Sequence, residues 1–260
     1  MKQVRFRDRA GTVRTGEWVD DDGTPADTET AGQGGEIRAA GQSYDPDAVT
    51  ILPPSEPSKI VCVGRNYAAH ADERGEDVPD RPLLFLKGPN AVASHGSDIS
   101  LLAEKDRQEY EAELAVVIGE QCRHVDEADA MDVVAGFTCM VDISNRDDQD
   151  RETNWIRGKA FDNAAPLGPV CADPEHVPDD ATVELHCNGE RRQSSTLDHL
   201  IFPIPELIAE ITAYMTLEPG DIIATGTPEG VGPLSDGDHV RVTIEGVGQL
   251  THTVTVPEED

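Results

Sequence analysis

Apolar and polar positions divide the chain near residue 58. Residues 1–57 are polar, with short alternating pieces such as VRFRD, and they end in the proline cluster LPPSEPS, which is typical of a boundary. From residue 59 onward the chain contains compact apolar runs typical of strands: KIVCVG, PLLFLK, ELAVVIG, VVAGFTCMVDIS, TVELHCNG, GDIIATG and HVRVTIEG. We therefore predict a small N-terminal β-rich domain over residues 1–57 and a main domain over residues 58–260.

Helical patterning is confined to fewer segments, mainly 67–74, 126–133 and 205–214. Asn188-Gly189, between TVELHC and ERRQSS, is a strong signal for a two-residue hairpin turn. The strand-like runs do not alternate regularly with helices, as a doubly wound sheet would require. The pattern predicts a strand-dominated α+β fold.

One apolar run begins with paired charges. In EYEAELAVVIG, residues 109–119, Glu111 and Glu113 are two positions apart, so in an extended chain their side chains point to the same side of the sheet. The run that follows is apolar on both faces, which indicates an interior strand. Two adjacent carboxylates at its start would repel each other and lose hydration unless a cation neutralised them.

Asp142 is the best candidate for a third carboxylate, because it follows the apolar run GFTCMV. Three carboxylates with no Cys or His nearby in the sequence make an all-oxygen site, which suits Mg²⁺, Mn²⁺ or Ca²⁺ and argues against zinc. The alternative is a solvated strand edge, which is the commoner origin of a Glu-x-Glu pair in an acidic protein.

Basic and amide side chains follow the carboxylates along the chain. Arg146 and Gln149 lie within one or two turns of Asp142 if the segment is helical, and Lys159 is one of only five lysines. A 2-oxo acid bound to a metal would need such groups for its remaining oxygens. Alternatively, Arg146 and Lys159 simply balance neighbouring aspartates.

Segment 64–76, GRNYAAHADERGE, places His70 and Glu73 one turn apart on a helix. The carboxylate could then orient the imidazole toward a bound water and raise its basicity. The alternative is an exposed helical ion pair.

A strand running into a glycine-rich loop, GDIIATGTPEGVG, covers residues 220–232. Its backbone N–H groups and hydroxyls at Thr225, Gly226 and Thr227 could bind a substrate carboxylate. A tight turn between strands is the alternative. The loop is not a nucleotide-binding motif, because no Walker lysine follows it, and H-E-x-x-H and G-x-S-x-G motifs are absent.

Composition narrows the class of partner. Acidic residues number 51 against 21 basic ones, and the net charge of −30 argues against nucleic acid or an anionic membrane as partner. The acidity is spread along the chain, as in a protein adapted to a salty cytoplasm. The five cysteines form no C-x-x-C, and no apolar run reaches about 18 residues, so we predict a soluble, cytoplasmic protein with reduced thiols.

Taken together, GRNYAAH, EYEAELAVVIG, DISNRDDQ, GKAFD, PLGP and DIIATGTPEGVG resemble, in order and spacing, the motifs of the fumarylacetoacetate hydrolase superfamily over residues 59–255. The resemblance implies a mixed β-sandwich roll, a homodimer, and Mg²⁺ or Mn²⁺ held by Glu111, Glu113 and Asp142. It implies that His70 and Glu73 form a water-activating dyad on a mobile lid helix, with Lys159 as a further catalytic group. The substrate-binding residues that it implies are Arg65, Arg146, Gln149, Gly226 and Thr227.

The resemblance leads us to expect metal-dependent cleavage of a C–C bond in a 2,4-dioxo acid, releasing pyruvate and a carboxylic acid. Oxaloacetate decarboxylation, 2-hydroxydienoate isomerisation and dehydration of a 2-keto-3-deoxy sugar acid use the same platform and remain alternatives. A non-catalytic protein that binds a metal or carboxylate is a further alternative. The presence of His70, Glu73 and Lys159 together favours an enzyme.

Overall fold

The computed structural model describes residues 1–257, and strands dominate it. The largest sheet has twelve strands, with β4-β3-β2-β1-β14-β12-β11-β17-β6-β7 as its main order; β5 pairs with β1, and β8 pairs with β14. Its strands are β1 (Lys2–Arg7), β2 (Val13–Val19), β3 (Glu36–Ala39), β4 (Gln42–Tyr44), β5 (Thr50–Leu52), β6 (Ile60–Gly64), β7 (Leu83–Lys87), β8 (Val92–Ala93), β11 (Ala112–Ile118), β12 (Val134–Val141), β14 (Ala165–Ala172) and β17 (Ile222–Ala224). Most neighbours are antiparallel, whereas β17–β6 and β14–β8 are parallel, so the sheet is mixed.

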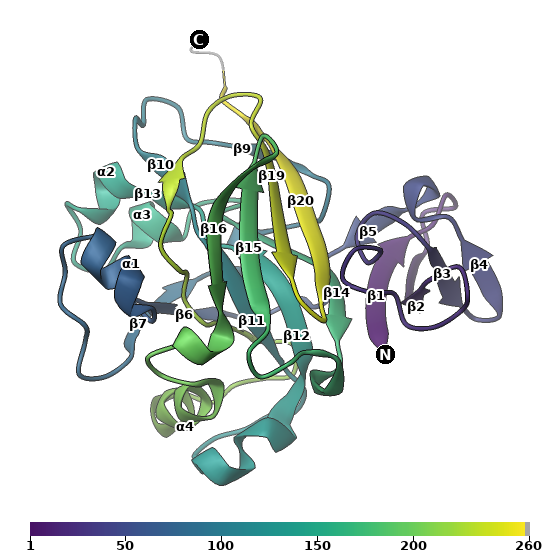
Figure 1. Ribbon diagram of the computed structural model, residues 1–260, viewed down its shortest axis with the longest axis horizontal. Helices are drawn as coiled ribbons and strands as arrows, with labels where there is room; N and C mark the ends of the chain where they lie inside the picture. The colour runs from purple at the N-terminus through teal and green to yellow at the C-terminus, as the bar shows by residue number, and fades with distance from the viewer. Residues whose placement is uncertain (258–260) are drawn as a thin grey trace.

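A second sheet of five strands, in the order β16-β15-β19-β20-β9, packs against the main sheet. It consists of β9 (Asp98–Ser100), β15 (Thr182–Cys187), β16 (Glu190–Thr196), β19 (His239–Ile244) and β20 (Gly248–Thr255). Figure 1 shows this sheet in front of β11, β12 and β14. A small third sheet contains β10 (Gln108–Tyr110), β13 (Ser144–Asn145) and β18 (Gly232–Pro233). The predicted strand-dominated α+β sandwich is confirmed.

Strand β11 lies at the centre of this architecture. It pairs with β12 on one side and β17 on the other, and all its residues are buried. The apolar residues on both faces of the strand are explained by this position, because each face is covered by other elements. The register places Ala112 opposite Val141, so the residues just outside this pair, Glu111 and Asp142, become neighbours.

The first 57 residues form strands β1 to β5, which lie to one side of the sandwich in Figure 1. They join the main sheet through β1, whose Lys2 and Gln3 pair with Ala172 and Cys171 of β14. Trp18 is buried here, and its indole N–H donates to the carbonyl of Gly34 at 2.6 Å. The division into two domains at residue 57 stays a prediction.

The helices are few and short: α1 (Ala68–Glu73), α2 (Arg146–Gln149), α3 (Ile156–Lys159) and α4 (Ile204–Tyr214). Five 3₁₀ segments accompany them within residues 1–257: Pro46–Ala48, Pro89–Ala91, Glu127–Val133, Pro174–His176 and Leu197–His199. The helix predicted over 126–133 is therefore a 3₁₀ helix. None of the described helices has the length and apolar character needed to cross a membrane.

The predicted hairpin at Asn188-Gly189 joins β15 to β16. Both residues have positive φ, 54° and 79°, as a type I′ turn requires.

Candidate active site

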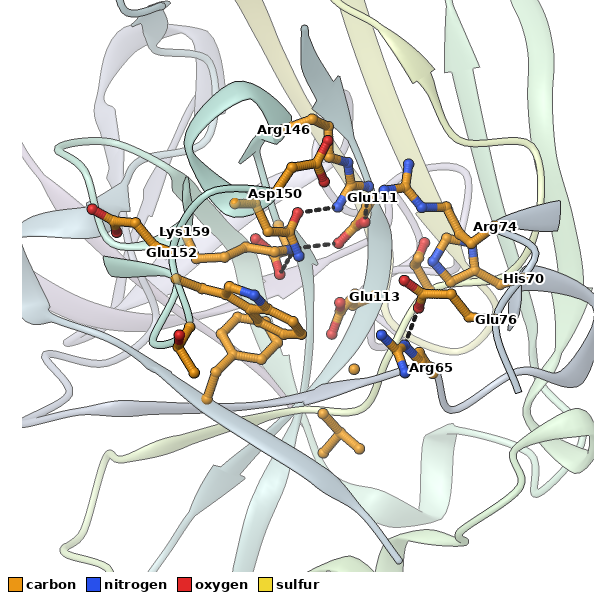
Figure 2. A pocket seen from close by; sticks show the side chains of 18 of the residues that line it. Arg65, His70, Arg74, Glu76, Glu111, Glu113, Arg146, Asp150, Glu152 and Lys159 are labelled. Atoms are coloured by element: carbon orange, nitrogen blue, oxygen red, sulfur yellow. Dashed lines mark hydrogen bonds and ion pairs between the residues drawn. The ribbon is translucent and has the colours of Figure 1, made fainter. Parts of the chain in front are cut away.

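A cavity of about 550 Å³ opens where β6, β7 and β11 meet helices α1, α2 and α3. Glu111 and Glu113 point into its centre in Figure 2, with His70 and Arg65 on one side and Lys159 on the other. Predicted site residues that line it are Arg65, His70, Glu111, Glu113, Asp142, Arg146, Gln149, Lys159 and Thr227. Segments far apart in the sequence thus contribute to one pocket.

The three predicted carboxylate ligands lie together. Glu111, Glu113 and Asp142 each offer an oxygen, and these oxygens lie within 4.8 Å of one another. The main chain sets this arrangement, because the amide of Asp142 donates to the carbonyl of Glu111 at 2.8 Å beside the first residue pair of β11 and β12. All three side chains are buried, so the solvated strand edge considered above is wrong.

The two glutamates have opposite electrostatic surroundings. Burial would raise the pKa of Glu111, but Arg146 and Lys159 outweigh it and hold this pKa well below its usual value. Burial raises the pKa of Glu113 well above its usual value, and the charges of Asp142 and Glu111 add to the effect. Glu113 accepts a hydrogen bond from the amide of Gly226 at 2.8 Å, and it has no ion pair with a basic side chain of residues 1–257.

Lys159 bridges two of the carboxylates from α3. Its ammonium nitrogen lies 2.7 Å from Glu111 Oε2 and 2.8 Å from Asp142 Oδ2, and it donates to Ser144 Oγ at 2.6 Å. Burial opposes its charge, but Asp142 and Glu111 raise the pKa of Lys159 above its usual value. A charged ammonium is thus held beside the carboxylates.

Lys87 is a buried cation that the sequence interpretation missed. It ends β7 with no exposed surface, lies 2.8 Å from Asp142 Oδ1, and donates to the carbonyls of Ile143 at 3.1 Å and Ala164 at 2.9 Å. It also donates to the carbonyl of Lys159. The available signal was its place at the end of the apolar run PLLFLK in a chain with five lysines.

The donors present suit a hard divalent cation. The cluster offers only carboxylate oxygens, and Asp142 Oδ1 is buried against the ammonium of Lys87 at 2.8 Å. Glu113 adds a buried carboxyl group that forms no direct ion pair with a basic side chain of residues 1–257, and the charge of Lys159 only partly counters the effects that raise its pKa. Buried charges are normally paired or coordinate metals, and all-oxygen sites favour Mg²⁺, Mn²⁺ or Ca²⁺. Glu111, Glu113 and Asp142 therefore fit such an ion.

His70 and Glu73 lie on α1 at one side of the cavity. His70 Nδ1 is 3.3 Å from Glu73 Oε2, and the imidazole is buried and lines the cavity. Glu73 does not line the cavity; both of its oxygens accept from the amide of Gly230, at 3.0 and 3.2 Å. The pair is therefore tied to the glycine-rich loop, and it is more than an exposed helical contact.

Arg146 and Gln149 lie on α2, as the predicted helical turn requires. Arg146 Nη1 donates to Gln149 Oε1 at 2.6 Å, and the same guanidinium contacts Glu111 and donates to Glu109 at 2.7 Å. Burial opposes its charge, but Glu111 and Glu109 raise the pKa of Arg146 above its usual value. Arg146 therefore pairs with the site and does not merely balance the aspartates beside it in sequence.

Arg65 lies at the cavity's outer side. Its φ of 59° is in the left-handed region that non-glycine residues rarely adopt, and its guanidinium pairs with Glu76. Both residues line the cavity and face each other in Figure 2. Phe85 and Trp155 form an aromatic part of the cavity wall, with ring centroids 5.5 Å apart.

The glycine-rich loop differs in part from the expectation. The amide of Gly226, predicted to bind a substrate carboxylate, instead donates to Glu113, and the hydroxyl of Thr225 donates to the carbonyl of Leu114 at 3.0 Å. Gly226 has a φ of +100°, and a Cβ there would lie 2.7 Å from Asn66 Cβ, so the close approach requires glycine. Only Thr227 of this group lines the cavity.

The model of the fumarylacetoacetate (FAA) hydrolase C-terminal family matches residues 59–255. The chain belongs to this family. An oxaloacetate tautomerase of Bacillus subtilis is 42% identical over 215 residues, which cover 78% of this chain and 71% of that protein. The family resemblance seen in the motifs is thereby confirmed.

Solved structures of family members superpose closely. A 5-carboxymethyl-2-hydroxymuconate delta-isomerase from Mycobacterium smegmatis has a TM-score of 0.88 at 36% identity, with 100% of both chains covered. A fumarylpyruvate hydrolase from Pseudomonas aeruginosa, solved in complex with Mn²⁺ and pyruvate, has a TM-score of 0.73 at 33% identity and covers 82% of this chain and 94% of its own. The relatives include a hydrolase, an isomerase and a tautomerase.

Proposed function

We propose that this protein is a divalent-metal-dependent hydrolase that cleaves a C–C bond in 2,4-dioxo acids of the acylpyruvate class. The observation that carries the proposal is the buried trio Glu111, Glu113 and Asp142 beside Lys159 and His70 in one cavity. The fumarylpyruvate hydrolase with bound Mn²⁺ and pyruvate supports the choice of Mg²⁺ or Mn²⁺ and of a 2-oxo acid ligand.

A divalent cation held by the trio would supply Lewis-acid stabilisation of the enolate that forms when the bond breaks. His70, oriented by Glu73, takes a proton from a water that attacks the C4 carbonyl. The C3–C4 bond then breaks, releasing a carboxylic acid and the enolate of pyruvate, which takes up a proton to give pyruvate. Lys159 and Arg146 offset the negative charge of the 2-oxo acid end.

Side chains that line the cavity bind the carboxylate of the 2-oxo acid substrate. Arg146, Gln149 and Thr227 face the cavity, and Arg65 stands at its outer side against Glu76. The amide of Gly226 donates a hydrogen bond to Glu113, so Gly226 influences ligand binding through that carboxylate and not by direct contact. A homodimer and adaptation to salt remain predictions that accompany this proposal.

Keto–enol tautomerisation of oxaloacetate is the second candidate. The identity of 42% to an oxaloacetate tautomerase favours it, since the same enolate-stabilising cluster serves both reactions. Tautomerisation needs a proton transfer at C3 and no attacking water, so the two reactions place different demands on His70.

The experiment is a substrate panel assayed in high KCl. Pyruvate release from acetylpyruvate, fumarylpyruvate and oxaloacetate is measured with Mg²⁺, with Mn²⁺ and with EDTA, alongside enol–keto conversion of oxaloacetate by ultraviolet absorbance. Metal-dependent pyruvate release from the acylpyruvates is the expected result. Enol–keto conversion of oxaloacetate without acylpyruvate cleavage would contradict the hydrolase proposal and favour the tautomerase. Full activity in EDTA would contradict the metal assignment.

A further inference from the structure

Gln193 is a buried side chain of β16 that lies outside the residues lining the cavity. It projects from β16 with 1% of its surface exposed and connects two segments of the site. Its Oε1 accepts from the amide of Ala112 at 2.9 Å, between the two glutamates of the trio. Its Nε2 donates to Thr227 Oγ1 at 2.9 Å and to the carbonyl of Pro228 at 2.8 Å.

The partners of this amide fix its orientation. The backbone N–H of Ala112 can only donate, and the carbonyl of Pro228 can only accept. Turning the amide over would place two donors together at Ala112 and two acceptors together at Pro228. The NH₂ group of Gln193 must therefore face Thr227, and the assignment does not depend on distinguishing oxygen from nitrogen directly.

A fixed donor at this position sets the direction of the Thr227 hydroxyl. A hydroxyl has one hydrogen to donate and can also accept. Because Thr227 Oγ1 accepts from Gln193, its own hydrogen is left to point elsewhere, and within residues 1–257 it has no acceptor. The side chain lines the cavity with 3% of its surface exposed.

We propose that Gln193 is a positioning residue that makes the hydroxyl of Thr227 a hydrogen-bond donor to the ligand in the cavity. This position then selects an acceptor oxygen, such as a carboxylate or keto oxygen, and disfavours a donor. The inference rests on the proposed function, which places a 2-oxo acid in this cavity. A hydroxyl held in one direction also loses less rotational freedom on binding than a free one, and a bond to a charged acceptor is stronger than a neutral one.

Oxalate, a small dianion with the two adjacent oxygens of a 2-oxo acid, is the probe, titrated calorimetrically in saturating Mg²⁺. Thr227→Val removes the donor at nearly constant volume and should weaken oxalate binding about tenfold. Thr227→Ser keeps the hydroxyl and should bind with an affinity close to that of the wild type. This pair leaves the backbone bonds of Gln193 intact, so it remains informative even if substitution of Gln193 prevents folding.

Gln193→Glu reverses the polarity at Thr227. The carboxylate still accepts from Ala112, but its second oxygen accepts the hydrogen of Thr227, turns it away from the ligand and leaves the carbonyl of Pro228 without its donor. Oxalate binding should fall about tenfold or more. The matched control is Gln108→Glu, because Gln108 is also buried, accepts from the amide of Leu102 at 2.8 Å and donates to the carbonyl of Leu102 at 2.9 Å. It adds the same charge without touching Thr227.

The double variant decides whether Gln193 acts through the hydroxyl. In the Thr227→Val background, Gln193→Glu should lower oxalate affinity no further than Gln108→Glu does, because no hydroxyl remains to be turned. An equal loss with and without the hydroxyl would overturn the inference, as would wild-type affinity in Thr227→Val. A wild-type protein that neither binds oxalate nor turns over the substrate panel would overturn the proposed function itself.

Discussion

Asp142 and Asp221 are both fully buried aspartates at strand ends, yet the protein surrounds them differently. Asp221, before β17, accepts from the amides of Ser58, Lys59 and Glu218 and from the hydroxyl of Ser58, and it pairs with Lys59. Asp142, after β12, pairs with the ammonium groups of Lys87 and Lys159, but within residues 1–257 no amide or hydroxyl donates to its carboxylate.

The difference separates a structural carboxylate from one available to a ligand. At Asp221, the protein's own donors saturate the side chain, which therefore stabilises the contact between β17 and the start of β6. At Asp142, two further carboxylates lie within reach, and among the described residues Glu113 forms no direct ion pair with a basic side chain. A buried charge left without a partner is destabilising unless an ion completes the site.

The largest effect should come from Glu113→Gln. Metal-dependent turnover should be abolished, because the substitution removes one of three predicted ligands, while the fold remains. In EDTA the variant should melt at or above the wild-type temperature, because an unpartnered buried charge has been removed. Turnover on the substrate panel and thermal unfolding with and without Mn²⁺ test both statements.

Asp221→Asn is the control that tests whether Asp221 differs from the carboxylates of the proposed metal site. It should lower the free energy of unfolding but leave the Mn²⁺ affinity unchanged. If it weakened Mn²⁺ binding as strongly as Glu113→Gln, the two carboxylates would not differ in kind.

His70→Gln should have the next largest effect and should sharpen the choice of reaction. Loss of a positioned base lowers rates about 10²–10⁴-fold, so acylpyruvate cleavage should fall within that range. Oxaloacetate tautomerisation should fall less, because it needs no activated water. Parallel assays of both reactions measure the ratio, and equal losses would contradict the water-activating role.

The two lysines that face these aspartates should also differ. Lys87→Met leaves Asp142 and three backbone carbonyls without their buried donor, so we expect a loss of about 3–5 kcal/mol in the free energy of unfolding. Lys59 is partly exposed, and Asp221 keeps its other donors, so Lys59→Met should cost only about 1 kcal/mol. Urea unfolding in EDTA measures both losses in the free energy of unfolding, and equal losses for the two variants would contradict the predicted difference between Lys87 and Lys59.

The smallest expected effect is on pH dependence. Burial would raise the pKa of Asp221, but hydrogen bonds from Lys59, Glu218 and Ser58 hold this pKa below its usual value. A carboxyl group with a lowered folded pKa stabilises the protein above the unfolded pKa of about 3.9, and this stability is lost as pH falls through the folded pKa. The stability difference between wild type and Asp221→Asn should therefore shrink below about pH 4. A difference that stays constant down to pH 3 would contradict this.

Local patterns in the sequence predicted much of the main domain. The apolar runs at β6, β11, β12 and β19, the hairpin turn at Asn188-Gly189 and the helix α4 all follow from periodicity and turn chemistry. Strand β14 was not among the predicted runs, because its sequence APLGPVCA contains two prolines and a glycine, although the strand lies in the middle of the sheet. The strand is stabilised by its neighbours and not by its own propensity.

The sequence by itself determined the residue types of the site and the pairing of Glu111 with Glu113, because a period of two fixes which side chains share a face. Only the tertiary structure placed Asp142 beside them, through the register of β11 and β12, and brought Lys87 and Gln193 from distant strands to the same site. It also showed that the amide of Gly226 donates a hydrogen bond to the carboxylate of Glu113. Register, burial and hydrogen-bond direction depend on contacts between segments far apart in the chain, and local pattern carries no information about them.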